Sequence, residues 1–124
     1  MSSKTSRDLM RNINDADQSL IIDAPTLAEI GRLQGNIAAA SALLKAMAHE
    51  GRLFILCLLY IRERSVMELE QSLDLRQPAV SQQLARLRSD KLVSTRRDGK
   101  MIYYSLASDE TRVMVSVLAN QFGR

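Results

Sequence analysis

Apolar residues recur every three or four positions across residues 30–47, which is the spacing of a helix with one buried side. The stretch follows Thr26 and Glu29, a pair with capping-box spacing, and predicts one helix over residues 26–48. Its apolar stripe consists of Ile30, Leu33, Ile37, Ala40, Leu44 and Met47. These heptad-like steps suit either packing on the protein's own core or a dimer interface, and the pattern alone favours neither.

Three further helices are predicted before residue 92. Residues 50–62 are apolar on nearly all sides, which is typical of a central buried helix. The next helix begins at Ser65, where Glu68 completes a second capping box, and ends near residue 74. After a turn of three or four residues, Gln77 and Pro78 open another helix, because proline is tolerated in a first turn.

The periodicity then changes to that of strands. Residues 92–97 and 101–106 are rich in β-branched and aromatic side chains, and Asp98-Gly99 between them is a strong hairpin signal. A last helix is expected over residues 109–122, capped by Ser108, with Val113, Val117 and Leu118 as its apolar stripe. The predicted fold is mainly α with a small β-hairpin.

Composition sets the scale of this fold. The chain has 124 residues, which fits one domain, expected over 24–124 after a polar, flexible N-terminal arm over 1–23. Its single cysteine cannot form an intramolecular disulfide. The longest apolar run, residues 53–61, is too short to span a membrane, and the N-terminus lacks the pattern of a signal peptide. We therefore expect a cytoplasmic protein with no membrane contact.

The order of the elements and their polar faces indicate DNA binding. Two short helices joined by a tight turn are typical of the helix-turn-helix, whose second helix enters the major groove. The polar face of that helix offers Gln77, Ser81, Gln82, Gln83 and Arg86, which suit base edges, and the hairpin tip offers Arg96, Arg97 and Lys100, which suit phosphates. Either set alone fits an ordinary solvated surface. Their coincidence, with a net charge of +3, favours double-stranded DNA as the partner.

Residues 43–122 resemble the ArsR/SmtB family of winged-helix repressors, and most closely its subgroup with BigR, SqrR, HlyU and NolR. The resemblance rests on LKAMAHEGRL (44–53), QPAVSQQLARL (77–87), LV (92–93) and IYYSL (102–106). It implies a winged helix-turn-helix, a homodimer formed by the first and last helices, and repression from an imperfect palindromic operator. It also implies that Ser81, Gln82 and Gln83 read bases, although many members carry histidine where Gln83 stands, and that the hairpin is the wing.

The same resemblance guides the search for a sensor. Metal-sensing relatives use a cysteine pair in the third helix or Asp, His and Glu on the last helix. This chain has one histidine, His49, and one cysteine, Cys57, so we expect no metal and no cofactor. Cys57 matches the first of two cysteines that redox-sensing relatives use, but Gly123 occupies the place of the second. Cys57 is thus either a small buried side chain or a one-cysteine redox sensor.

Two other functions compete with this interpretation. A winged-helix interaction module that no longer binds DNA is the alternative to the DNA-binding repressor. The absence of Asp and Glu from Gln77 to Ser89 favours DNA binding over this module. An enzyme would need a nucleophile with a base, a metal site or a phosphate-binding loop, and the sequence offers none of these, so we expect no enzymatic activity.

Overall fold

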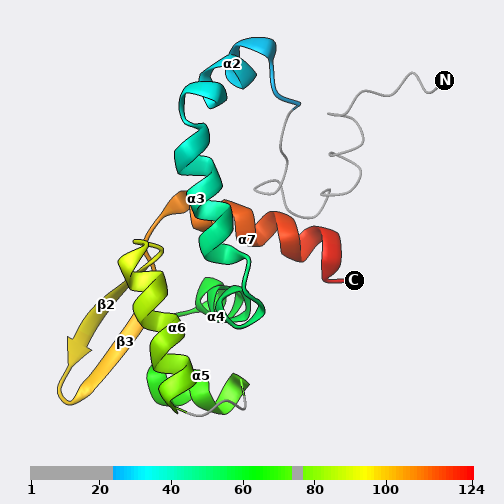
Figure 1. Cartoon of the computed structure of the whole chain (residues 1–124). Coiled ribbons are helices and arrows are strands. Elements are labelled where there is room, and N and C mark those ends of the chain that lie inside the picture. Colours follow the sequence, from blue (N-terminus) through cyan, green and yellow to red (C-terminus); the bar gives the residue numbers. More distant parts are fainter. Residues whose placement is uncertain (1–23, 74–76) are drawn as a thin grey trace.

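The computed structural model describes residues 24–73 and 77–124, so the predicted arm over 1–23 lies outside the described residues. The chain is mainly helical with one small antiparallel sheet, which confirms the predicted fold class (Figure 1). The elements are α2 (Leu27–Gly35), α3 (Ile37–Met47), α4 (Glu50–Ile61), β1 (Arg64–Ser65), α5 (Val66–Leu73), α6 (Gln77–Ser89), β2 (Val93–Asp98), β3 (Met101–Leu106) and α7 (Asp109–Phe122). Among the described helices, none combines the length and the apolar character needed to cross a bilayer.

Helix α4 is central, as its apolar sequence predicts. Ile55, Leu56 and Leu59 are buried on it, and His49 caps its first turn by accepting hydrogen bonds from the amides of Gly51 and Arg52. Every neighbouring helix and β2 add side chains to this core, including Met47, Leu69, Val80, Leu84, Leu87, Val93 and Val115. Burying one such side chain stabilises the fold by roughly 1.5–3 kcal/mol, so α4 anchors the whole domain.

The helix-turn-helix is built as the sequence predicts. The Ser65 hydroxyl accepts from the Glu68 amide, and the Glu68 carboxylate accepts from the Ser65 amide, which completes the capping box of α5. Three residues, 74–76, separate α5 from α6 and lie outside the described part of the chain. The predicted stripe Val80, Leu84 and Leu87 is fully buried, so α6 presents its other side to solvent.

The sheet differs from the prediction in two details. Asp98 pairs with Met101 at the end of the ladder, so the turn consists of Gly99 and Lys100 rather than Asp98 and Gly99. Gly99 has φ +62°, which glycine adopts without steric cost at the first position of such a turn. The unpredicted strand β1 is only two residues long and pairs with β3, giving the order β1-β3-β2. A two-residue strand has no periodicity to detect.

The predicted helix over 26–48 is divided at Asn36. The capping box of Thr26 and Glu29 forms as expected at its start. At Asn36 the backbone leaves the helical region, and the side-chain amide donates to the carbonyl of Arg32. Asparagine after glycine favours such a break, because both residues are poor helix formers and the asparagine side chain competes for backbone groups.

The apolar stripe of α2 and α3 does not serve the core of its own chain. Ile30, Leu33, Ile37 and Leu44 are each 42–56% exposed, and within the stripe only Met47 is buried. Figure 1 shows α2 at the far tip of the chain, away from the body of the domain. The interpretation of the stripe as own-core packing is therefore wrong for these four residues.

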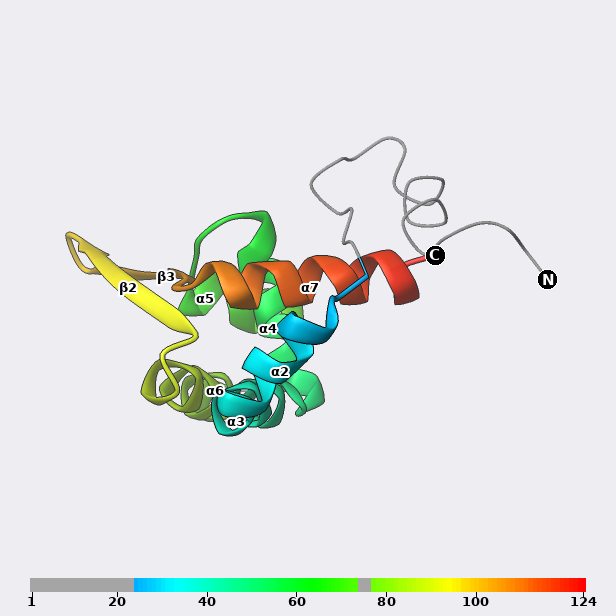
Figure 2. The ribbon, with the colours of Figure 1, turned by 90° about the horizontal axis from the view of Figure 1, so that it is seen from above.

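The buried face of α7 also differs from the predicted one. Val113 is 51% exposed, whereas Thr111, Val115 and Ser116 are buried. The reason is polar docking on α4, because the Ser116 hydroxyl donates to the Tyr60 hydroxyl at 3.0 Å. In the view from above, α7 lies along the same side of the domain as α4 (Figure 2). A hydrophobicity pattern cannot find a buried face that carries two hydroxyl side chains.

Helix α6 ends in a conformation that glycine would adopt more easily than the residue present. Lys91 has φ +64°, and the amides of Lys91 and Leu92 donate to the carbonyls of Arg88 and Leu87, which is the Schellman pattern.

We expect the free energy of unfolding to be about 1 kcal/mol higher for Lys91→Gly than for Lys91→Ala, because only glycine escapes the steric penalty of a Cβ atom at positive φ. Urea denaturation of both variants measures the difference, and equal midpoints would contradict it.

Candidate nucleic-acid interface

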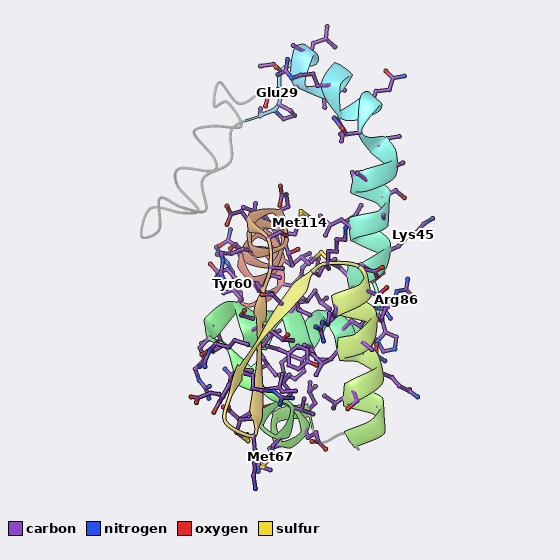
Figure 3. All side chains as sticks on the ribbon, turned by 90° about the vertical axis from the view of Figure 1, so that its left-hand side faces the viewer. Glu29, Lys45, Tyr60, Met67, Arg86 and Met114 are labelled. Carbon is purple, nitrogen blue, oxygen red and sulfur yellow. The ribbon has the colours of Figure 1, made fainter. Side chains whose placement is uncertain are left out.

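Helix α6 lies along one edge of the molecule with one side free. Figure 3 shows it at that edge, with Arg86 near its C-terminal end and Lys45 of α3 on the same edge. Its exposed side chains are Ser81, Gln82, Ala85, Arg86, Arg88 and Ser89. The side chain of Gln77 lies outside the described residues, although its backbone begins the helix. The free side is polar and has no carboxylate, which suits a polyanionic surface.

The three residues predicted to read bases do not share one environment. Ser81 and Gln82 are exposed, but Gln83 is half-buried on the flank that faces α4. There its side-chain oxygen accepts a hydrogen bond from Nη1 of Arg52, at 3.4 Å. The expectation that all three side chains stand freely on the outer face is therefore wrong for Gln83.

Arg52 is a site residue that sequence analysis missed. Its Nε donates to the carbonyl of Ala46 at 2.7 Å, and its Nη2 donates to the carbonyl of Lys45 at 3.3 Å. Arg52 thus connects the end of α3 to α6. The sequence does contain a signal for a special role of this residue, because Arg52 is the only charged residue in the otherwise apolar stretch 51–61. A cation in the first turn of a helix opposes the helix dipole and requires compensation from elsewhere.

Arg86 has an ionic partner just beyond the end of its own helix. Its Nε lies 2.8 Å from Oδ2 of Asp90, in an i,i+4 ion pair with both side chains partly exposed. An exposed pair of this kind contributes little stability and exchanges readily for another anion. Arg86 can therefore reach a phosphate by giving up this partner.

The wing is the hairpin of β2 and β3, and its three predicted cations are not equivalent. Arg96 forms an ion pair with Glu63, with Nε 2.9 Å from Oε2, and its guanidinium lies 4.6 Å from the ring centre of Tyr103. The hydrogen bond from Arg96 lowers the pKa of Glu63, and the same bond raises the pKa of Arg96. Both groups are thus charged at neutral pH, and Glu63 compensates the charge of Arg96.

The other two wing cations are free to meet phosphate. Arg97 and Lys100 are exposed, and neither forms a salt bridge with any residue in 24–73 or 77–124. Lys100 lies in the hairpin turn itself. The prediction of three equivalent phosphate contacts therefore changes to two free cations, Arg97 and Lys100, and one compensated cation, Arg96.

The environment of the candidate sensor residue does not favour its reactive form. Cys57 is half-buried on α4, and burial raises the pKa of its thiol. A raised pKa lowers the thiolate fraction at neutral pH, and thiolate is the reactive form. Within the described part of the chain, no three His, Cys, Asp or Glu side chains are grouped so that they could hold a metal ion.

Comparisons with known proteins agree with this geometry. Residues 49–95 match the family described as bacterial regulatory protein, arsR family. The chain is 49% identical over 86 residues to the transcriptional activator HlyU of Vibrio cholerae, covering 69% of this chain and 80% of that protein. It is also 49% identical over 76 residues to the biofilm growth-associated repressor of Agrobacterium fabrum, covering 61% and 65%. The structure of reduced HlyU from Vibrio cholerae superposes with a TM-score of 0.72, at 45% identity, and covers 75% of this chain and 98% of that one.

The unequal wing cations lead to a test by salt titration. We expect Arg97→Ala and Lys100→Ala each to reduce the slope of log affinity for duplex DNA against log salt by about one for each phosphate that is no longer neutralised. Arg96→Ala should change the slope less, because Glu63 already neutralises its charge. Glu63→Gln is the matched control and should raise DNA affinity by freeing Arg96. Equal slopes for Arg96→Ala and Arg97→Ala would show that Arg96 leaves Glu63 when DNA binds.

Proposed function

The chain belongs to the arsR family of bacterial regulatory proteins, and on this basis we propose that it is a repressor that binds a palindromic operator as a homodimer. It is a transcriptional regulator with a helix-turn-helix DNA-binding domain, like its relatives. We further propose that it binds DNA through α6 and the wing, and that it acts in the cytoplasm.

The observation that carries the proposal is the free side of α6. A helix fits the major groove, and Ser81 and Gln82 on this side offer donors and acceptors that match base edges. The buried stripe on the opposite side packs α6 into the core shared with α4, α5 and β2. Residues 77–89 contain no Asp or Glu, which suits the negatively charged DNA backbone. Binding another protein would not require this absence of acidic residues.

The dimer is supported by the state of α2 in a single chain. This helix has nine residues and none of them is buried. Helices shorter than about 12–15 residues are marginal in water unless their apolar side packs on something. Ile30, Leu33, Ile37 and Leu44 offer that side, and Val113 and Phe122 of α7 are exposed as well. A second copy of the chain would cover both surfaces.

The proposed mechanism follows from two copies of one site. Two α6 helices related by a twofold axis would enter successive major grooves on one face of the duplex, which requires a palindromic operator. Gln77, Ser81, Gln82 and Gln83 would meet bases, while Arg86, Arg97 and Lys100 would meet phosphates. A dimer seated over a promoter would exclude RNA polymerase and so repress transcription. Cys57 would serve as a packing residue.

Base reading by α6 has a direct test. We expect Ser81→Ala to weaken binding to a duplex selected from a random-sequence pool by about 1–3 kcal/mol, and to relax the preference at one position per half-site. Ser89→Ala, at the C-terminal end of the same helix, is the control and should change neither. Unaltered binding by Ser81→Ala, together with unaltered salt slopes for the wing variants, would show that DNA is not bound through α6 and the wing. Failure of the wild type to select any duplex would favour the interaction-module alternative.

The dimer proposal is tested by light scattering at micromolar concentration. The wild type should have the mass of two chains. Ile37→Glu places a charge in the apolar stripe once per copy, so it should shift the protein to the mass of one chain and weaken operator binding at least about tenfold. Ile61→Glu, at an isoleucine on α4 that is more exposed than Ile37 (72% against 56%), is the control and should stay dimeric. A monomeric wild type would refute the proposal.

A further inference from the structure

Gln83 and Arg52 form the one direct side-chain hydrogen bond that the structure records between α4 and the DNA-facing helix α6, among residues 24–73 and 77–124. We propose that Arg52 is a positioning residue that turns the Gln83 amide so that its NH₂ group, and not its oxygen, meets the DNA. Gln83 then recognises only base edges that offer a hydrogen-bond acceptor, and it discriminates against cytosine. This inference rests on the proposed DNA-binding function and adds a specificity rule to it.

The orientation of the amide follows from the chemistry of the two groups. A guanidinium has five N–H donors and no acceptor, so only the oxygen of an amide can face it. The Oε1 atom of Gln83 therefore points back toward Arg52, and Nε2 is the amide atom left without a hydrogen-bond partner among the described residues. The Nη1–Oε1 distance is 3.4 Å, and turning the amide the other way would bring N–H donors against N–H donors.

Arg52 can direct another side chain because it is itself held. Two bonds, to the carbonyls of Ala46 and Lys45, fix its guanidinium at the end of α3. The free carbonyls at a helix C-terminus carry partial negative charge and favour a cation. Among the described residues Arg52 has no carboxylate partner within salt-bridge distance, so these carbonyls and the Gln83 oxygen are its acceptors. The half-buried guanidinium is thus a fixed donor against which Gln83 aligns.

The consequence concerns one base position in each half-site. In the major groove adenine and guanine offer the N7 acceptor, guanine adds O6 and thymine offers O4, whereas cytosine offers only the N4 amino donor. A freely rotating glutamine would turn its oxygen to meet cytosine. With the oxygen turned to Arg52, the donor NH₂ of Gln83 would face the donor NH₂ of cytosine. The wild type should therefore bind a cytosine at this position about tenfold more weakly than the preferred base.

The test uses the duplex selected by the wild-type protein and all its single base-pair substitutions. Arg52→Met should reduce the discrimination against cytosine at one position per half-site to about twofold, and leave the other positions unchanged. Arg64→Met is the matched control, because Arg64 also donates from Nε to a carbonyl near a helix C-terminus, that of Leu58, but does not bond to α6. It should keep the wild-type preference.

A second variant keeps the inference testable if Arg52→Met does not fold. Gln83→Glu retains an acceptor for Arg52 but presents no donor to the DNA, so the preference at the same position should invert toward cytosine, whose amino group donates to carboxylates. The inference is overturned if folded Arg52→Met still rejects cytosine, or if Gln83→Glu does not gain preference for it. A wild type that selects no duplex overturns the proposed function, and this outcome is distinct from selection without the cytosine rule.

Discussion

Burial of α4 is the constraint on which the other elements depend. Ile55, Leu56 and Leu59 on this helix belong to one buried cluster with side chains from α3, α5, α6, α7 and β2. The stripe of α6 packs on this core, so the polar side of α6 is fixed in the opposite direction. The same helix carries Arg52 near its start and Tyr60 near its end, which form hydrogen bonds to Gln83 of α6 and Ser116 of α7 respectively. The candidate DNA-binding surface is therefore a product of interior packing.

Electrostatic partners then divide the cations of that surface into two kinds. Arg96 and Arg52 have partners within the protein, namely Glu63 for the first and helix-end carbonyls for the second. Arg97 and Lys100 are exposed without a salt bridge among the described residues. A cation with a fixed protein partner shapes the site, whereas an exposed one is available to neutralise phosphate and release counterions. Net charge alone cannot distinguish these roles.

The N-terminal helices show the opposite situation, in which a surface has no partner within the described chain. Ile30, Ile37 and Leu44 follow the regular steps of a helix pair but face solvent in one chain. Apolar side chains exposed together on a short helix forgo the burial energy that would stabilise it. The apolar side of α2 and α3 is thus left exposed in a single chain, while the core around α4 is packed without it.

The sequence by itself determined the features that depend on near neighbours. These features are the caps at Thr26, Ser65 and Ser108, the buried stripe of α6 and the hairpin turn with its glycine. The caps and the stripe form as predicted, and the turn lies one position further along the chain than predicted. Only the tertiary structure decided which side of α7 is buried, that Arg96 binds Glu63 and that Gln83 faces Arg52. The members of those two side-chain pairs lie 33 and 31 residues apart. Periodicity and propensity act over a few residues of chain, whereas the partner of a side chain is chosen by the packing of distant segments.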